Sequence, residues 1–319
     1  MNEKRKDLIY SIGEFIPNGV KFNEPLAEHT TFRIGGPAEF WVEPGNLKEL
    51  ASVIRVAKKK NIPLFIIGAG SNILGLDAGI KGIVISLNRG YFKKIEAKKN
   101  KILCGAGARL TFLLGRARSF NLGGLEFLSG IPGTFGGALA MNAGIATVIK
   151  NEKLKIKNGK TKTKSIGDLV EDITVMDYNG NIKLINKKNL DFGYRTSNLS
   201  GYVILNATLK LKKRNREKIK EDIDKYLSRR RMTQDLSCSS AGCIFKNPSL
   251  NESAGRLIDL CGLKGKSIGG AFVSLKHANF IFNNGNAKAG DVLRLMSLIR
   301  RKVKNKFNVE LEPEIKIWP

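Results

Sequence analysis

The sequence has few of the residues that build most protein metal sites. Of its 319 residues only two are histidines and four are cysteines, and no two cysteines are spaced as C-x-x-C. Structural zinc sites need several such ligands at close spacing, so we expect no metal centre. In a reducing compartment the thiols stay free, and each is then either a core filler or a chemical group.

Long apolar runs are also missing. No stretch reaches the roughly 20 apolar residues that cross a bilayer. The first residues, Met1–Asp7, are mostly charged, whereas a secretion signal has an apolar core. We therefore expect a cytoplasmic protein that does not insert into membranes.

Acidic residues are scarce. There are 28 aspartates and glutamates against 55 lysines and arginines, which gives a formal charge of +27. Such a chain can bind nucleic acid, anionic lipid or a multiply charged small substrate. The lysines are spread along the whole chain, however, and the arginine-aromatic motifs of nucleic-acid modules are absent. This distribution favours a solvated basic surface, and we expect no nucleic-acid partner.

Glycine, in contrast, is concentrated in two segments. Gly124–Ala138 contains a proline among its glycines, and we expect it to form neither a stable helix nor a good strand. Gly68–Asn72 follows Pro63–Ile67, which has the composition of a buried strand. Bare backbone N–H groups in such loops can approach a bulky anion closely. The two segments together predict a diphosphate cofactor gripped from two sides.

Apolar periodicity and turn signals predict a mixed α+β chain without the strict alternation of a doubly wound sheet. A hairpin is predicted around Asn179-Gly180, and the lysine-rich segment 148–165 is predicted to be an exposed basic hairpin or loop. A charge shift at Lys212–Arg214 marks the predicted domain boundary. The predicted helices are 47–60, 109–120, 216–231 and 291–307, and the predicted strands are 63–67, 83–87, 101–104, 172–177, 182–185 and 202–211.

Eight short motifs, taken in order, give the chain a specific resemblance. From about Pro25 to Ile317 it resembles the UDP-N-acetylenolpyruvoylglucosamine reductases, the MurB flavoenzymes of peptidoglycan synthesis. Any one motif is weak evidence, and it is their shared order that makes the resemblance specific. The motifs are His29–Gly36, Gly68–Asn72, Gly130–Gly137 with Met141–Gly144, Tyr194–Ser197, Gly242–Pro248, Gly262–Gly265, His277–Phe280 and Leu311–Glu314.

The resemblance implies a fold of two domains. After an N-terminal lead-in, residues 1–27, a two-lobed FAD-binding domain of the vanillyl-alcohol-oxidase (PCMH) type would span 28–212, with the lysine-rich insertion 148–165. A smaller α+β substrate-binding domain would span 213–319. The chain lacks the long insertion that one branch of the family has after Pro248, so it resembles the shorter, second type. A monomer without an obligatory protein partner is implied.

The resemblance also implies the reaction. NADPH would reduce non-covalently bound FAD and leave, and UDP-N-acetylglucosamine enolpyruvate would then be reduced to UDP-N-acetylmuramate. Hydride adds to the β-carbon of the enolpyruvyl group, negative charge develops beside its carboxylate, and the α-carbon is protonated last. In this pattern Arg195 stabilises the developing charge, a protonated Glu314 hydrogen-bonds to it, and Cys243 donates the proton.

Cys243 departs from the family pattern, because many relatives have serine at this position. A thiol is more acidic than a hydroxyl and donates its proton readily. It becomes a useless thiolate above its pKa, which is ordinarily about 8.5. We therefore predict that catalysis falls on the alkaline side with the ionisation of Cys243.

The other site residues are carried over from the matching motifs. Asn247, Lys264 and Asn279 would meet the nucleotide sugar, with Lys264 facing its phosphates. Relatives continue Asn-Ala-Gly with an aromatic-glycine segment, which Ile145–Thr147 replaces here, so contacts made there are not carried over. The residues expected to bind FAD are Gly68, Ala69, Gly70, Ser71, Asn72, Gly133, Thr134, Gly136, Gly137 and Asn142.

Two alternatives stay open. A flavin-dependent oxidase of sugars or lactones would share the fold, but many such oxidases attach flavin covalently through histidine. Neither His29 nor His277 lies in the cofactor loops. A basic nucleic-acid-binding protein on an inactive enzyme scaffold would account for the charge, but it would leave the catalytic motifs unexplained.

Overall fold

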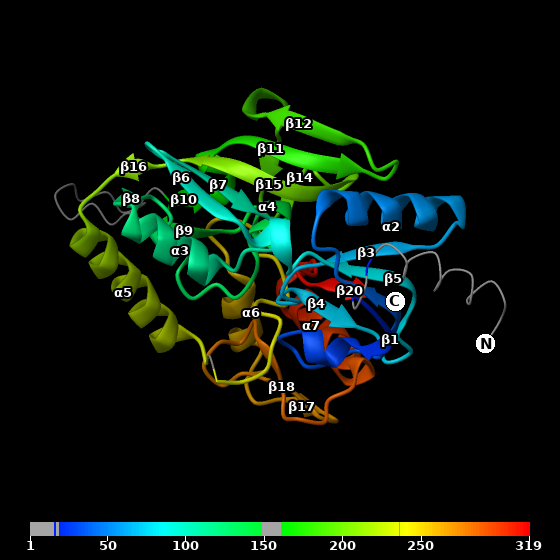
Figure 1. Cartoon of the computed structure of the whole chain (residues 1–319). Coiled ribbons are helices and arrows are strands. Elements are labelled where there is room, and N and C mark those ends of the chain that lie inside the picture. The colour runs from blue at the N-terminus through cyan, green and yellow to red at the C-terminus, as the bar shows by residue number, and fades with distance from the viewer. Residues whose placement is uncertain (1–15, 17–18, 149–160, 236) are drawn as a thin grey trace.

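The computed structural model describes residue 16 and residues 19–148, 161–235 and 237–319. Figure 1 shows a five-stranded sheet across the top, a four-stranded sheet below it, and helix α2 between the two. A third group of short strands and helices, formed by the C-terminal residues, lies at the bottom. The mixture of helices with largely antiparallel strands confirms the α+β class.

The first lobe is the four-stranded sheet, with strand order β1-β2-β5-β3. β1 is antiparallel to β2, whereas β2, β5 and β3 run parallel. Leu50, Ile54 and Ala57 form the buried stripe of α2, which packs into a core shared by both lobes. The elements are β1 (Val20–Pro25), the 3₁₀ helix η1 (Leu26–His29), β2 (Pro37–Val42), α2 (Leu47–Lys59), β3 (Leu64–Ile67), β4 (Ile73–Gly75) and β5 (Ile80–Ser86).

The second lobe is the five-stranded antiparallel sheet, with strand order β12-β11-β15-β7-β6. The predicted hairpin is confirmed. β11 and β12 are joined by a turn in which the Asp177 carboxylate accepts hydrogen bonds from the N–H groups of Asn179 (2.8 Å) and Asn181 (2.9 Å). The elements are η2 (Gly90–Lys93), β6 (Ile95–Lys98), β7 (Lys101–Gly105), α3 (Leu110–Ser119), β8 (Leu122–Gly123), η3 (Glu126–Leu128), α4 (Phe135–Ala140), β9 (Gly144–Val148), β10 (Thr161–Ser165), η4 (Ile166–Leu169), β11 (Val170–Asp177), β12 (Ile182–Asn186), η5 (Lys187–Asn189), β13 (Phe192–Gly193), β14 (Thr196–Ser197), β15 (Tyr202–Lys210) and β16 (Lys212–Lys213).

The C-terminal part has its own core, built by residues such as Phe245, Leu257 and Leu295, and it also takes in Phe32 and Leu74 from the first lobe. Its last strand, β20, leaves this core and pairs in parallel with β4. The chain end is thereby tied to the first lobe. The elements are α5 (Arg216–Thr233), α6 (Ala254–Leu260), β17 (Ser267–Ile268), β18 (Ala271–Val273), β19 (Ile281–Asn283), α7 (Ala289–Phe307) and β20 (Lys316–Trp318).

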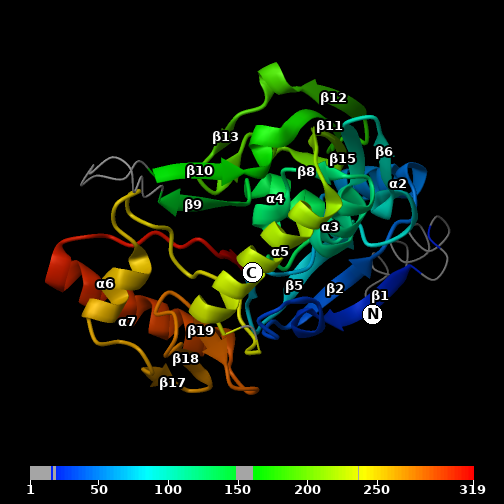
Figure 2. The ribbon, with the colours of Figure 1, turned by 90° about the vertical axis from the view of Figure 1, so that its left-hand side faces the viewer.

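Helix α5 connects the second lobe to the C-terminal part. Figure 2 shows it crossing the molecule from the second lobe toward β19. It packs against η3 and α3 of the second lobe. Its first turn is capped by Asn215, whose side chain accepts from the N–H groups of Glu217 and Lys218. The predicted boundary at 212–214 therefore falls at a helix start, although the helix itself rests on the lobe before it.

The glycine-rich segment contains a helix, contrary to the sequence prediction. α4 begins directly after Thr134, whose hydroxyl accepts a hydrogen bond from the Gly137 N–H (3.4 Å). Gly136 packs against the backbone and methyl group of Ala106, where a Cβ would lie 2.8 Å from the Ala106 Cβ. The cap and this close approach outweigh the low helix propensity of glycine, so the segment forms a short helix.

The lysine-rich segment is flanked by a hairpin. β9 and β10 pair antiparallel, from Gly144 with Ser165 to Val148 with Thr161. Residues 149–160, which complete the predicted insertion, lie outside the described residues. The remaining predicted elements are confirmed to within a few residues, with β5 beginning at Ile80 rather than at residue 83. None of the helices in the described ranges combines the length and hydropathy that crossing a bilayer requires.

Candidate active site

The two glycine segments of the sequence meet face to face between the lobes. A Cβ on Gly68 would overlap the Thr134 hydroxyl, and a Cβ on Gly133 would lie 3.4 Å from Ser71 Oγ. Both loops therefore present bare backbone to one shared space, in which Gly68 and Gly137 are exposed. A cradle of this kind, which side chains would fill, fits the diphosphate of FAD. The residues are brought together as the sequence predicts.

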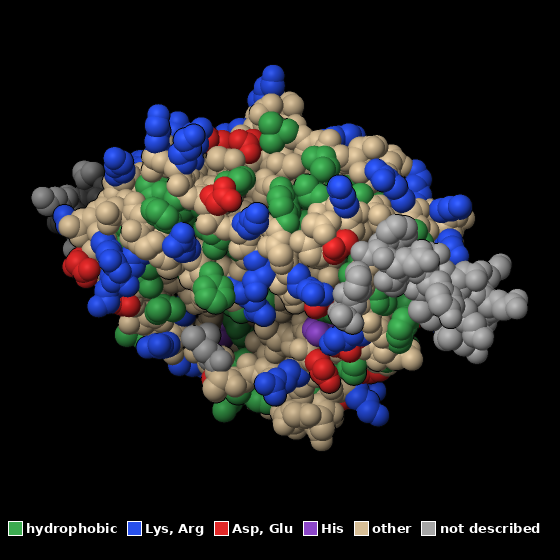
Figure 3. Space-filling view, viewed as in Figure 1, with side chains coloured by type: hydrophobic (Ala, Val, Ile, Leu, Met, Phe, Trp, Pro, Cys, Tyr) green, Lys and Arg blue, Asp and Glu red, His purple; other side chains and the backbone are tan. Residues whose placement is uncertain are grey.

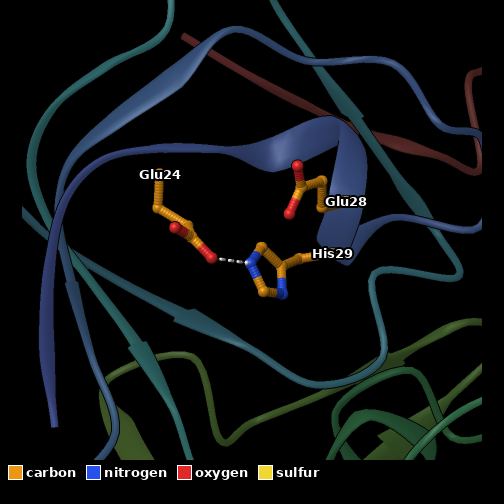
Figure 4. Close-up of side chains that lie close together, drawn as sticks. All are labelled: Glu24, Glu28 and His29. Carbon is orange, nitrogen blue, oxygen red and sulfur yellow. Dashed lines mark hydrogen bonds and ion pairs between the residues drawn. The ribbon is translucent and has the colours of Figure 1, made fainter. Parts of the chain in front are cut away.

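The loop before β2 holds the first glycine segment in place. Gly70 has a φ of +60° and lies against the His29 carbonyl so closely that a side chain would clash with it, and Thr31 N–H donates to Gly70 O (3.2 Å). Figure 4 shows His29 pointing at Glu24, with Nε2 2.8 Å from Glu24 Oε1. The imidazole also stacks on Trp41, at 3.7 Å between ring centroids. This arrangement fixes the backbone that Gly70 rests on.

Glu24, Glu28 and His29 bring three possible metal-ligand atoms within 4.8 Å of one another. Glu24 is also hydrogen-bonded to Lys21. Burial raises the pKa of the Glu24 carboxyl, but the hydrogen bonds from Lys21 and His29 outweigh this effect and lower it. The cluster is thus explained as an ion pair and a stacked histidine that support the cofactor loop, and nothing in the arrangement requires a cation.

Asn142 uses its side chain to hold neighbouring loops. Its amide donates to Gly193 O (2.9 Å) and accepts from the Gly167 N–H (3.1 Å). The residue is buried and has a φ of +42°, a conformation that asparagine tolerates better than most residues. Both ends of the amide are therefore engaged within the protein. Asn142 fixes the segment between α4 and the turn that carries Arg195.

Arg195 lies at the tip of the short β13–β14 hairpin, in a left-handed conformation with a φ of +58°. Its Nε is 2.8 Å from Glu314 Oε1, an ion-pair distance, although the N–H makes no directed hydrogen bond. Nη1 donates to Gly144 O (3.2 Å), and the guanidinium lies over the ring of Tyr194. A strained backbone that supports a partly buried charge is typical of a functional site.

The backbone of Glu314 connects the other parts of the site. Its carbonyl accepts from Asn72 Nδ2 (3.1 Å) in the cofactor loop, and its N–H donates to the Ile244 carbonyl (2.8 Å), next to Cys243. Burial raises the pKa of the Glu314 carboxyl, and the charge of Arg195 opposes this shift without cancelling it. A carboxyl of this kind stays protonated at higher pH than an ordinary one, so it can donate a hydrogen bond.

Cys243 faces the same cluster from the C-terminal part. Burial raises the pKa of its thiol to about 12, and the neighbouring Glu314 adds to the rise, while Arg195 and Arg230 oppose it. An alkaline loss of activity that follows the ionisation of Cys243 is therefore expected at higher pH than for an ordinary thiol. As a proton donor it is available, and as a nucleophile it is inert.

The three residues predicted to bind the substrate differ in how far their side chains are already engaged by other protein groups. Asn279 is buried, and its amide exchanges hydrogen bonds with the N–H (3.0 Å) and carbonyl (2.8 Å) of Phe245, so it clamps the segment that carries Cys243. Asn247 is exposed and accepts from the Ala254 N–H (3.1 Å). Lys264 pairs with Asp259 (2.7 Å), a partner it would exchange for the phosphates of a ligand.

Arg230 belongs to the same cluster, although the sequence does not single it out. It lies near the end of α5, and its charge acts on Cys243 together with that of Arg195. In the sequence it stands within the run Arg229–Arg231 on a helix of mainly polar residues, a pattern that indicates a solvated helix face. Only the packing of α5 on η3 shows which of these arginines turns inward.

One face of the molecule is hollowed. Figure 3 shows a depression between the body formed by the two lobes and the C-terminal part below it, with lysine and arginine side chains around its rim. Basic side chains around a recess attract anionic ligands. This setting fits a diphosphate cofactor and a nucleotide-sugar substrate.

Comparison with known proteins agrees with this geometry. The model of the family described as UDP-N-acetylenolpyruvoylglucosamine reductase, C-terminal domain, matches residues 233–318, and that of the FAD binding domain matches residues 38–185. A UDP-N-acetylenolpyruvoylglucosamine reductase of Clostridium novyi is 41% identical over 300 residues, which cover 93% of this chain and 92% of the relative. One of Caldanaerobacter subterraneus is 41% identical over 313 residues, which cover 97% of each chain. The crystal structure of the reductase from Thermus caldophilus superimposes with a TM-score of 0.75 at 36% identity, covering 92% of this chain and 97% of that one.

Proposed function

The chain belongs to the UDP-N-acetylenolpyruvoylglucosamine reductase family, and we propose that it uses FAD and NADPH to reduce UDP-N-acetylglucosamine enolpyruvate to UDP-N-acetylmuramate for peptidoglycan synthesis. One observation carries the proposal. Arg195, Cys243 and Glu314 come from three distant parts of the sequence and meet beside the glycine cradle. A guanidinium, a neutral thiol and a carboxyl of raised pKa are the groups that this reduction needs.

The first of these needs is a place for negative charge. When bound, FAD supplies the hydride that adds to the β-carbon of the enolpyruvyl group. Arg195 is held beside Glu314 and Gly144, so it can face the substrate carboxylate without reorganising when charge develops next to it. Glu314, if protonated, donates a hydrogen bond to the oxygen atoms of that carboxylate. Both groups act more strongly in the transition state than in the ground state.

The second need is a proton for the α-carbon. Cys243 holds one, because burial keeps its pKa at about 12. After transfer the sulfur carries a negative charge, and the guanidinium groups of Arg195 and Arg230 are the neighbours that stabilise it. Asn279 fixes the donor by clamping the backbone at Phe245, two residues along the chain. The thiol is then reprotonated from water.

We propose the division of labour that the sequence suggests. Residues 28–212 hold FAD through Gly68–Asn72 and Gly133–Gly137, and residues 213–319 hold the nucleotide sugar through Asn247 and Lys264. The enzyme would act in the cytoplasm as a monomer without an obligatory protein partner, which size-exclusion chromatography with light scattering tests directly.

An anaerobic experiment tests the function. The purified protein, loaded with FAD, is reduced with NADPH until the flavin absorbance bleaches, and UDP-N-acetylglucosamine enolpyruvate is then added. Recovery of the absorbance with that substrate, and with formation of UDP-N-acetylmuramate, supports the proposal. Bleaching without recovery contradicts it.

The oxidase alternative predicts a different outcome, because oxygen alone would then restore the flavin colour at catalytic rates. Denaturation gives a second criterion, since a covalently attached flavin stays with the protein and a non-covalent one is released. Nucleic-acid binding predicts an affinity that falls steeply with salt. The cluster of Arg195, Cys243 and Glu314 has no role in either alternative, so neither is favoured.

A further inference from the structure

The side chain of Arg230 lies against a glycine of the neighbouring lobe. Gly130 has a φ of +74°, and a Cβ there would lie 2.8 Å from Arg230 Cδ and 3.2 Å from a Leu227 methyl group. The stem of Arg230 therefore lies directly on the Gly130 backbone. Any larger residue at 130 would displace it, so the position of the Arg230 stem is fixed by the fold.

The guanidinium of Arg230 has no acidic partner within the described ranges. No carboxylate there lies at ion-pair distance, and the polar contact of the side chain is Nη1 to Gln234 Oε1 (3.3 Å). Burial lowers the pKa of Arg230, the direction expected for a cation withdrawn from water without a balancing anion. Leaving such a group unpaired is costly unless a ligand brings the anion.

Arg195 differs from Arg230, because two of its guanidinium nitrogens already face partners within the protein. Its Nε faces Glu314 at 2.8 Å, and its Nη1 donates to Gly144 O. The site thus contains two guanidinium groups and one carboxyl, and the pKa of that carboxyl is raised. The charges of both guanidinium groups act on the Cys243 thiol. This excess of positive charge favours the binding of an anionic group of the ligand beside Cys243.

We propose that Arg230 is a second carboxylate-binding residue, which holds the enolpyruvyl carboxylate of the substrate together with Arg195 on the side of the Cys243 thiol. The inference rests on the proposed function, and it names the part of the substrate that this arginine contacts. The carboxylate is the nearest anionic group to the α-carbon that Cys243 protonates, and the charge of Arg230 acts electrostatically on the Cys243 thiol. A fork of free N–H donors suits a carboxylate.

The test compares ligands with and without this carboxylate. Arg230→Ala and Arg230→Lys are prepared, with Arg229→Ala as the matched control on the exposed side of the same helix. Dissociation constants of UDP-N-acetylglucosamine enolpyruvate and of UDP-N-acetylglucosamine are measured from the change in flavin absorbance. Single-turnover rates of reduction by NADPH and of reoxidation by substrate are measured separately.

Arg230→Ala should weaken binding of the enolpyruvyl substrate by about 10- to 100-fold, as expected for a lost charge-assisted contact. Binding of UDP-N-acetylglucosamine and reduction by NADPH should change by less than about threefold, as should every parameter of Arg229→Ala. Added guanidinium should restore part of the reoxidation rate of Arg230→Ala, which a merely structural role would not allow.

Two results would overturn the inference. An equal loss of affinity for both ligands would assign Arg230 to the diphosphate or to folding, and unchanged affinity for both would mean that it contacts no ligand. Neither result bears on the proposed function, which fails only if the unaltered protein is not reoxidised by the enolpyruvyl substrate. The two failures are therefore distinguishable in one set of measurements.

Discussion

Gly68 of the first lobe lies against Thr134 of the second so closely that a methyl group on Gly68 would overlap the threonine hydroxyl. That hydroxyl caps α4 by accepting a hydrogen bond from the Gly137 N–H. The first cofactor loop therefore fixes the start of the helix that carries the second. A substitution at residue 68 should therefore alter the loops on both sides of the proposed diphosphate site.

Gly68→Ala should weaken FAD binding by about 5- to 10-fold, because loss of a helix cap costs about 1 kcal/mol. Titration of the apoprotein with FAD, followed by flavin fluorescence, measures the effect. The control is Gly115→Ala in α3, where a Cβ would meet nothing within 4 Å. The control should bind FAD normally and gain about 0.5–1 kcal/mol of stability. Equal FAD affinity in both variants would contradict the prediction.

Cys243→Ala should lower the rate of reoxidation by substrate by about 10²- to 10⁴-fold, the range for a lost proton donor. Reduction by NADPH should be unchanged, because that half-reaction needs no proton on the substrate carbon. Stopped-flow absorbance separates the two steps. Cys243→Ser keeps a donor of similar size and should retain most of the rate. Reoxidation of Cys243→Ala at the parent rate would rule out this donor.

The pH profile should lack an alkaline limb at the pKa of an ordinary thiol. Because burial raises the pKa of Cys243 to about 12, the thiol stays protonated as pH rises to about 10. The reoxidation rate should be level from pH 7 to about pH 10 and fall only beyond it. A rate that halves near pH 8.5 in single-turnover measurements would show that the thiol is less buried in the working enzyme.

Asn279→Ala should destabilise the C-terminal part. It leaves the N–H and carbonyl of Phe245 without their partners in a buried place, at a cost of roughly 2–4 kcal/mol in the free energy of unfolding. Urea denaturation followed by circular dichroism measures the change. Asn251→Ala, at an exposed position, is the control and should lie within about 0.5 kcal/mol of the parent. A loss of activity without any loss of stability would instead indicate direct contact with substrate.

Asp177→Asn should reduce the acid sensitivity of folding. Hydrogen bonds from the backbone of Asn181 and Asn179 lower the pKa of Asp177 to about 2. A lowered pKa stabilises the fold above the unfolded value of about 3.9, and this contribution is lost as pH falls toward 2. Urea midpoints between pH 5 and pH 2.5 should fall less steeply in the variant. Identical slopes would mean that the turn does not depend on the charge.

The sequence predicts most of the elements because their signals are local. The helical stripe of α2 and the Asn179-Gly180 turn each depend on residues that are neighbours in the chain. Local signals do not predict α4, since its formation depends on contact between Gly136 and Ala106, which are brought together by the fold. Propensity along the chain cannot include such a contact.

The site residues likewise divide into those that local sequence motifs predict and those that depend on contacts made in the fold. Arg195, Cys243 and Glu314 lie in motifs whose order identifies the family, so the sequence alone is enough to locate them. Arg230 cannot be located in this way, because its role depends on which face of α5 rests on Gly130. The pKa of Cys243 is likewise set by burial, a property of the folded chain rather than of the motif. Asn279 has the right motif but acts in the structure as a clamp on Phe245.

The parallel pairing of β20 with β4 joins residues that the ribosome makes far apart in time. Asn72 and Glu314, which are hydrogen-bonded beside these strands, are 242 positions apart in the chain. During synthesis the edge of β4 therefore lacks its partner until the residues up to β20 have been made. Unpaired strand edges of nascent chains are sites of misassembly. The edge of β4 is therefore open to misassembly for as long as the residues between β4 and β20 are being made.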